Sequence, residues 1–346
     1  MRIAIDNTPL KTEHQYRGIG FYTKNLIEAL KTYDKKNEYI FFTRGEKLPK
    51  VDLVHRPYFD LFFLTLPFSK KYPTVVTVFD VTPLIFQGYY SIGFRGWIKF
   101  FLQRYSLKSA NKIITISQTA KEDIAKFLKE PLEKIEVIHL AASPIFQPIT
   151  NHLSLATIKN KYHLPEKFIL YVGDVNYNKN LKNLFRAMVK VDLPLVMVGQ
   201  AAGDDNLPEV RSLLKLAQDL KISEKIIRTG FVADSDLAGI YNLAKVLVLP
   251  SLAEGFGLPV LEAIQAGCPV VCSNIPVLKE VAEDSVIFIN PNSQENLASA
   301  IQKVLQFNNS QLEVLKKKGL DQAKKFSWAK TAQETIKVYA KVISDQ

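Results

Sequence analysis

Residues 246–263 read VLVLPSLAEGFGLPVLEA, and three features of this stretch predict how the chain folds. The first five residues are apolar, partly β-branched and end in a proline, which is typical of a buried strand. Two glycines follow at 255 and 257. A helix is predicted to open near Pro259, because proline is favoured in the first turn of a helix. The stretch therefore indicates a strand, a glycine-containing loop and a helix.

The same alternation of short apolar runs and amphipathic stretches continues in both directions along the chain. It predicts parallel sheets that helices cover on both faces. The predicted strands are residues 2–6, 39–42, 52–55, 74–79, 112–117, 135–139, 168–172, 195–199, 226–229, 246–250, 269–272 and 286–289. The predicted helices include residues 21–31, 118–128, 180–189, 208–220, 235–244 and 259–266. About six strands per half favour two doubly wound α/β domains over one eight-stranded barrel.

The length of 346 residues also fits two domains. Residues 144–154 contain two prolines and few strand formers, so they are the predicted linker. We expect one Rossmann-like domain at residues 1–150, a second at residues 155–327, and a terminal helix at about residues 328–346. Ligands should bind at the carboxyl ends of the strands in such sheets.

The composition excludes several classes of protein. Hydrophobic residues make up 47% and charged residues 23%, which excludes disorder and collagen-like repeats. No apolar run reaches the roughly 18 residues that a membrane span needs, and Asp6 argues against a signal peptide. Cys268 and Cys272 are expected as buried thiols in a reducing compartment, and the scattered histidines argue against structural zinc. These features predict a cytoplasmic protein.

Two glycine-containing loops are candidates for binding an anion. Gly18 and Gly20 precede a helix predicted to begin at Phe21, but the third glycine of the dinucleotide fingerprint is missing, and a flexible turn is an equally good interpretation. The second loop is the stronger candidate. Backbone N–H groups around residues 256–258 can point at a phosphate there, with the dipole of the following helix adding to the attraction.

Two acids, Glu254 and Glu262, bracket the second loop. A carboxylate is poorly suited to binding phosphate, but sugar and ribose hydroxyls are donors that it can accept. The alternatives are a solvated loop acid for Glu254 and a solvated helix face for Glu262. For an isolated pair of acids these alternatives would prevail.

Motifs in a consistent order along nearly the whole chain resemble retaining glycosyltransferase family 4, which has the GT-B fold. They are EGFGLPVLEA at residues 254–263, YVG at 171–173 with NKNL at 178–181, ITISQTA at 114–120, AGCPVV at 266–271, and FSW at 326–328 with Thr331 and Ala332. The sequence RGIG at residues 17–20 is most similar to that of mannosyltransferase-like members. The resemblance implies two Rossmann-like domains facing a central cleft, with the acceptor on the N-terminal side and the donor on the C-terminal side. It also implies that the terminal helix packs back on the first domain.

The resemblance implies a role for each matched residue. Glu254 lies near the transferred sugar, and Lys179 binds the donor diphosphate, whose growing negative charge a fixed ammonium stabilises. The carboxylate of Asp234 could accept hydrogen bonds from the edge of a guanine base, which favours GDP as the nucleotide of the donor. The implied donor-binding residues are Gly18 near the phosphates, Val232 and Asp234 at the base, Phe256, Gly257 and Leu258 in the loop, and Glu262 at the ribose.

The chain departs from the family pattern at two places. Phe79-Asp80 stands where the family often has His-Asp, and Asp174 and Asn178 occupy positions where it often has an arginine. Arg17 is a candidate to replace the missing cation. We place Arg17, Phe79 and Asp80 on the acceptor or sugar side, and a weakened or inactive enzyme stays open.

The sequence Asp234-Ser235-Asp236 has the spacing of metal-binding D-x-D motifs. It directly precedes a predicted helix, so an N-cap is the favoured interpretation. Members of family 4 need no metal. We therefore expect neither a metal nor a cofactor, with the nucleotide sugar acting as a substrate.

Charge is concentrated in the first half of a chain whose net charge is +11: residues 1–150 contain 22 basic and 14 acidic residues. Residues 89–105 mix aromatic side chains with bases, and residues 58–72 add further phenylalanines and two lysines. The pattern fits contact with an anionic membrane, or a core helix with a hydrophobic loop, which we slightly favour. It also fits stacking on single-stranded nucleic acid. No recognition module accompanies it, so no nucleic-acid partner is expected.

Together these features predict retaining transfer of a hexose, with mannose from GDP-mannose as the best candidate, to a glycan or lipid-linked acceptor. No carboxylate is placed as a nucleophile, so the departing phosphate oxygen is expected to take the acceptor proton on the same face, as is proposed for the family. The alternatives are a non-catalytic nucleotide-sugar-binding module of a glycan-assembly complex and a sugar-nucleotide epimerase.

Overall fold

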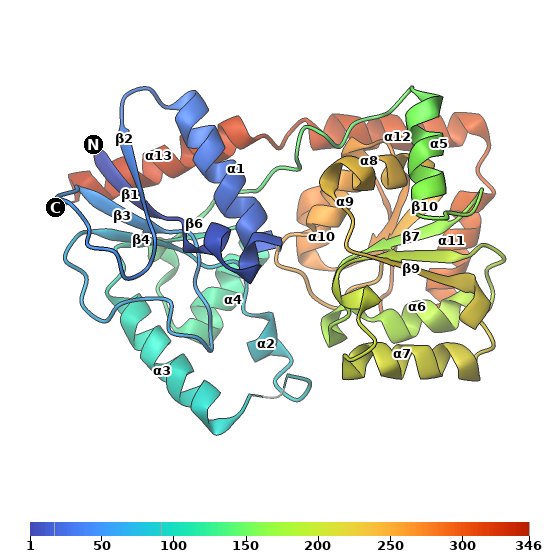
Figure 1. Ribbon diagram of the computed structural model, residues 1–346, viewed down its shortest axis with the longest axis horizontal. Coiled ribbons are helices and arrows are strands. Elements are labelled where there is room, and N and C mark those ends of the chain that lie inside the picture. The colour runs from blue at the N-terminus through green and yellow to red at the C-terminus, as the bar shows by residue number, and fades with distance from the viewer. Residues whose placement is uncertain (17, 91, 346) are drawn as a thin grey trace. The chain divides into compact units, whose positions relative to one another are not determined.

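The computed structural model describes residues 1–16, 18–90 and 92–345 (Figure 1). The chain divides into two compact units. The first unit contains residues 1–141 and the C-terminal stretch from Phe326, and the second contains Ala142–Lys325.

The first unit is built on a six-stranded parallel sheet with the strand order β2-β1-β3-β4-β5-β6. Its strands are β1 (Arg2–Asp6), β2 (Glu38–Phe42), β3 (Leu53–Arg56), β4 (Thr74–Thr77), β5 (Lys112–Thr115) and β6 (Ile135–Val137). Its helices are α1 (Gly18–Tyr33), α2 (Thr82–Ile85), α3 (Phe94–Lys108), α4 (Gln118–Leu128) and α13 (Trp328–Ser344), with 3₁₀ turns at Thr8–Lys11, Glu13–Tyr16 and Leu132–Lys134.

Buried polar contacts attach the C-terminal helix α13 to this sheet. The hydroxyl of Tyr339 on α13 lies 2.6 Å from Nδ1 of His55 on β3, and the other ring nitrogen of His55 lies 2.8 Å from Oγ1 of Thr77 on β4. Burial lowers the pKa of His55 to about 3, so the ring is neutral at physiological pH. Because α13 also packs along α1, this helix belongs to the first unit although it lies at the end of the chain.

The second unit contains a six-stranded parallel sheet with the strand order β12-β11-β10-β7-β8-β9. Its strands are β7 (Ile169–Val172), β8 (Leu195–Val198), β9 (Ile226–Gly230), β10 (Val246–Leu249), β11 (Val270–Ser273) and β12 (Ile287–Ile289). Its helices are α5 (His152–Lys161), α6 (Leu181–Met188), α7 (Pro208–Asp219), α8 (Asp234–Leu243), α9 (Leu258–Gln265), α10 (Pro276–Ala282), α11 (Gln294–Leu305) and α12 (Asn309–Ala323), with 3₁₀ turns at Tyr177–Lys179, Ala201–Gly203 and Ser223–Lys225.

Helices cover both faces of the second sheet, with α6 and α7 on one side and α8 and α9 on the other (Figure 1). The four residues of β7, like those of β8 and β10, are all buried, as expected for strands covered on both faces. The α/β architecture with two doubly wound parallel sheets, predicted from the alternation of strands and helices, is therefore confirmed.

Two local expectations are wrong. The first helix begins at Gly18 rather than Phe21, so both glycines lie in its first turn and not in a loop before it. The predicted linker at residues 144–154 belongs to the second unit, which begins at Ala142. Its end is already helical, because the Asn151 side chain accepts the N–H of Leu153 at 3.0 Å and caps α5.

Both cysteines are buried, as predicted. In the part of the chain that the structure describes, no helix has the length and apolar character required to span a membrane.

Candidate active site

The strand order of the second sheet indicates where on this sheet a ligand is expected to bind. The order reverses between β7 and β10, which lie side by side, and open parallel sheets bind ligands outside the carboxyl ends of the strands at such a point. The connection from β7 to α6 contains Lys179, and the connection from β10 to α9 contains Glu254. The topology thus brings together two residues that are 75 positions apart.

Lys179 and Glu254 form an ion pair at this edge. The Nζ atom of Lys179 lies 2.7 Å from Oε1 and 2.9 Å from Oε2 of Glu254. The two side chains are only 15% and 8% exposed, so each charge depends on the other for compensation. The hydroxyl of Ser251 donates to Oε1 at 2.6 Å and holds the carboxylate in place. The solvated-loop alternative for Glu254 is therefore wrong.

Two asparagines that flank Lys179 join the two loops. The side-chain amide of Asn178 donates to the carbonyl of Ala253 at 3.0 Å, and the carbonyl of Asn178 accepts the N–H of Leu252 at 2.7 Å. Asn180, which is left-handed with φ 57°, donates to the carbonyls of Pro250 at 3.0 Å and Pro291 at 2.7 Å. The residue at 178, where the family often has an arginine, thus fixes the backbone on both sides of the ion pair.

The start of α9 requires glycine at position 257. Gly257 has φ 93°, and a Cβ there would stand 2.4 Å from Cδ2 of Leu278. It precedes the helix as its N-cap with no side-chain cap, and Pro259 occupies the first turn. Phe256 is buried and Leu258 half-buried. The first N–H groups of α9 are therefore placed beside the loop that holds Glu254, an arrangement suited to an anion.

Glu262 lies one turn into α9 and is only 7% exposed, so the alternative of a solvated helix face is wrong. The hydroxyl of Tyr241, on α8, donates to its Oε2 at 2.9 Å. Burial, with a smaller contribution from the charge of Asp234, raises the pKa of Glu262 to about 8, although the hydrogen bond from Tyr241 lowers it.

The residues proposed for the base lie between β9 and α8. Val232 is buried, whereas Asp234 is exposed and occupies the first helical position of α8. The expectation that an acid of the Asp234-Ser235-Asp236 motif caps this helix is wrong, because the N-cap is Ala233 and the motif already lies in the first turn. Asp236 is held by Lys161 at 2.6 Å and by the hydroxyl of Tyr162 at 2.8 Å. Within the described residues, no three His, Cys, Asp or Glu side chains gather in a metal-binding group.

The remaining predicted residues lie in the first unit. Gly18 opens α1, with open space where a Cβ would stand. The ring of Phe79 packs edge-on against Tyr22 at 5.1 Å between centroids, and Asp80 accepts the N–H of Thr82 at 2.9 Å. Arg17 lies outside the described residues.

Two residues at the carboxyl edge of the first sheet were not predicted from the sequence. Nη1 of Arg56, at the end of β3, lies 2.9 Å from Oδ2 of Asp6, at the end of β1, and their side chains are 11% and 7% exposed. The strand order of this sheet reverses between β1 and β3. The sequence feature that could have pointed to them is the charged residue at the end of each of the two apolar runs that form β1 and β3.

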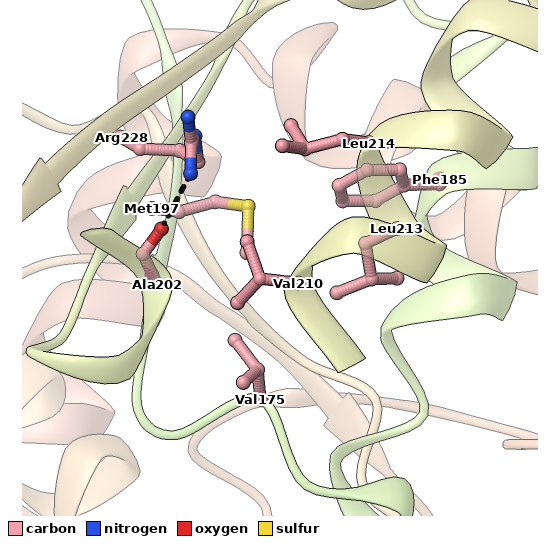
Figure 2. Close-up of a pocket in the computed structure, with 8 residues that line it drawn as sticks. All are labelled: Val175, Phe185, Met197, Ala202, Val210, Leu213, Leu214 and Arg228. Carbon is pink, nitrogen blue, oxygen red and sulfur yellow. Dashed lines mark hydrogen bonds between the residues drawn. The ribbon is translucent and has the colours of Figure 1, made fainter. Parts of the chain in front are cut away.

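A small apolar pocket lies elsewhere in the second unit. Figure 2 shows its lining, with Met197 of β8 facing Val210, Leu213 and Leu214 of α7. Arg228 borders it and donates to the carbonyl of Ala202 at 3.1 Å. Neither Lys179 nor Glu254 lines this pocket, so it is distinct from the ion-pair site.

Comparison with known proteins identifies the family. Residues 156–322 match the family described as Glycosyl transferases group 1, and residues 16–143 match Glycosyltransferase Family 4. The chain belongs to glycosyltransferase family 4 and has the GT-B fold. The resemblance inferred from the motifs is therefore confirmed.

Individual relatives agree with this assignment. The chain is 33% identical over 241 residues to O-antigen chain mannosyltransferase B of Escherichia coli, covering 68% of this chain and 61% of that protein. Sucrose-phosphate synthase from Thermosynechococcus elongatus superposes with a TM-score of 0.78 at 19% identity, over all of both chains. Anabaena Alr3699/HepE in complex with UDP-glucose has a TM-score of 0.74 at 15% identity, over 99% of this chain and all of that one. The chain thus spans less than two thirds of the length of this Escherichia coli mannosyltransferase.

Proposed function

We propose that this protein transfers a hexose from a nucleotide sugar to a hydroxyl of a glycan or lipid-linked acceptor, with retention of the anomeric configuration. The observation that carries the proposal is the Lys179–Glu254 ion pair at the point of the second sheet where ligands of such sheets bind. GDP-mannose is the proposed donor. The similarity to an O-antigen chain mannosyltransferase and the acid at Asp234 support this choice.

The ion pair can serve both parts of the donor. When a diphosphate approaches, the Lys179 ammonium has a second acceptor for its hydrogen bonds and can stabilise the charge that develops on the leaving phosphate. Glu254 then faces the sugar, where positive charge develops in an oxocarbenium-like transition state. Ser251 keeps the carboxylate oriented while Lys179 moves between its two partners.

The remaining steps need only the donor and the acceptor. The bond from the anomeric carbon to the phosphate oxygen breaks, and the acceptor oxygen attacks from the same face. The acceptor proton passes to the departing phosphate oxygen, so the products are a glycoside and a nucleoside diphosphate. We propose that no metal or cofactor takes part. Glu262 would exchange hydrogen bonds with the ribose hydroxyls through its other oxygen, while Tyr241 donates to Oε2.

A nucleotide-release screen tests this function. Purified protein is incubated with GDP-sugars and UDP-sugars, with and without acceptor extracts, and the product's anomeric configuration is read by NMR. Acceptor-dependent release of GDP from GDP-mannose and a retained α-linkage are expected. Heat protection by a nucleotide sugar without release would instead indicate the binding module, and a changed sugar nucleotide formed without acceptor would indicate an epimerase. We further propose a cytoplasmic location and contact with a membrane.

A further inference from the structure

The helix α3 exposes aromatic side chains and buries polar ones. Phe94, Ile98, Phe101 and Tyr105 are spaced four, three and four residues apart, so they share one helix face. They are 81%, 45%, 60% and 69% exposed, whereas Gln103 is fully buried. A helix on the surface of a soluble domain normally shows the opposite distribution.

Buried hydrogen bonds fix this orientation. The amide of Gln103 donates to Oγ1 of Thr65 at 2.6 Å, and its carbonyl oxygen accepts the N–H of Leu66 at 3.1 Å. The hydroxyl of Ser106 donates to the carbonyl of Pro67 at 2.6 Å. Turning α3 to hide its aromatic face would leave these buried groups without partners, which is costly.

Only some of the aromatic residues at 89–105 belong to the apolar core. Trp97 and Phe100 pack into the apolar core of the first unit, as the favoured interpretation of residues 89–105 expected. Phe94, Phe101 and Tyr105 are exposed instead, although the ring of Phe101 contacts those of Trp97 and Phe100. The core interpretation is therefore confirmed for Trp97 and Phe100 and wrong for these three residues.

A neighbouring loop extends the exposed face. Phe63, Leu64 and Phe68 are 63%, 44% and 52% exposed, and Nζ of Lys99 on α3 lies 5.0 Å from the ring centroid of Phe63. We call the whole surface the α3 patch; it consists of Phe63, Leu64, Phe68, Phe94, Ile98, Phe101 and Tyr105. Large exposed apolar side chains concentrated on one helix and on a loop that contacts it are typical of an interaction site.

The charges around the patch indicate that its partner is anionic. The sequence of α3 contains four bases and no acid, with Arg95 and Lys108 exposed at its two ends. A second copy of the same patch would bring like charges together. Acidic headgroups supply the opposite charge, and aromatic side chains insert at the boundary between headgroups and acyl chains.

We propose that the α3 patch docks on an anionic lipid bilayer. The aromatic face of α3 enters the interface, and Arg95 and Lys108 contact the headgroups. This inference names the surface and the lipid class for the membrane contact proposed above, and it does not depend on the transferase activity, because it rests on the first unit alone.

Vesicle sedimentation without donor or acceptor tests the inference. The protein should pellet with vesicles of phosphatidylcholine mixed with phosphatidylglycerol, but not with phosphatidylcholine alone, and pelleting should fall as salt rises. Lys108→Glu should weaken binding at least about fivefold, since each engaged base contributes about that factor. Phe94→Ser should weaken it by at least as much, because it removes a side chain that enters the interface.

Matched control variants lie in the second unit. Leu153→Ser on α5 removes a side chain that is 81% exposed, like Phe94, and Lys317→Glu on α12 changes the net charge as Lys108→Glu does. Both should bind vesicles like the wild type, and circular dichroism should show that all variants are folded. Equal pelleting with both vesicle types would overturn the proposal, as would equal losses in the controls. A dimer that Phe94→Ser dissociates, with no vesicle binding, would show that a second copy occupies the patch.

Discussion

At the scale of single residues, the site depends on common side-chain types that specific contacts hold in fixed positions. Asn178 replaces a common cation of the family, yet its amide ties the two loops together at 3.0 Å. Lys179 is consequently the one cation that the structure shows paired with Glu254 among the described residues. The proposed stabilisation of the leaving diphosphate therefore depends on this one ammonium.

Lys179→Ala should lower donor turnover by about two to four orders of magnitude, because it removes the fixed charge that stabilises the leaving diphosphate. Lys182→Ala is the matched control, since Lys182 is exposed on α6 only three residues away. Steady-state rates of nucleotide release compare the two. Turnover of folded Lys179→Ala within threefold of the wild type would refute the phosphate assignment.

Glu254→Gln and Glu262→Gln should change different kinetic constants. In the proposed mechanism Glu254 faces the charge that develops at the sugar, so Glu254→Gln should mainly lower kcat, by about tenfold to a thousandfold. Contacts of Glu262 with ribose exist equally in the ground and transition states, so Glu262→Gln should mainly raise the donor KM, by about tenfold. Kinetics with the donor found in the screen decide this. Reversed effects would mean that the two acids have been assigned the wrong way round.

Glu262 should also make stability depend on pH. Burial raises its pKa to about 8 in the folded chain, whereas an unfolded glutamate titrates near about 4.3. Between these values the folded chain binds more protons, so this residue's contribution to the free energy of unfolding falls as pH rises toward 8. Relative to the wild type, Glu262→Gln should therefore gain a few degrees in Tm between about pH 5 and pH 8.

Melting curves of Glu262→Gln, the wild type and Glu209→Gln measure this effect. Glu209 is exposed on α7 in the same unit, so its substitution should leave the pH dependence unchanged. If Tm of Glu262→Gln and of the wild type changed in parallel with pH, the carboxyl of Glu262 would not hold its proton in the folded chain.

At the scale of elements, the position at which α9 begins sets the geometry of the site. Gly257→Ala places a methyl group 2.4 Å from Leu278 at a positive φ, so it should destabilise the second unit by about 1–3 kcal/mol. It should also lower donor affinity by shifting the first turn of α9. Gly88→Ala is the control, because nothing lies within 4 Å of a Cβ there.

Urea unfolding and donor titration of both variants provide the measurement. An unchanged unfolding midpoint for Gly257→Ala would show that the loop adapts to a side chain, contrary to the tight contact with Leu278.

The start of α1 was misplaced in the sequence analysis for a reason that also concerns a whole element. Glycine has a low helix propensity, so the pattern favoured a loop at residues 18–20, but α1 packs against α13 and includes them.

At the scale of the whole molecule, the first unit is assembled from two ends of the chain. Removing residues 326–346 takes away α13 with its contact from Tyr339 to His55 and uncovers apolar residues of α1. The first unit should lose several kcal/mol of stability or unfold, since fully burying each large apolar side chain contributes about 1.5–3 kcal/mol. The second unit should stay folded.

Tryptophan fluorescence in urea follows this loss. Trp97 and Trp328 are the two tryptophans of the chain, so the truncated protein keeps only Trp97, which reports on the first unit. Removing residues 345 and 346 alone is the control, because it leaves α13 intact. A wild-type transition of Trp97 after the larger truncation would mean that α13 contributes nothing to the first unit.

The sequence by itself determined the alternation of strands and helices, the two parallel sheets and the glycine-containing loop before α9. These features follow from hydrophobic period and from local preferences of glycine and proline, which act over a few residues. It also singled out Lys179, Glu254 and Glu262 as separate candidates. Their types and spacing in the motifs were sufficient for that.

Only the tertiary structure decided that Lys179 and Glu254 form one buried pair, that burial raises the pKa of Glu262, and that α3 shows aromatic side chains to solvent. It also decided that α13 completes the first unit. Each of these facts depends on contacts between residues far apart in the chain, such as the 75 positions that separate Lys179 from Glu254. Sheet pairing and burial create such contacts, and with them the desolvation that shifts a pKa, so no local pattern can reveal them.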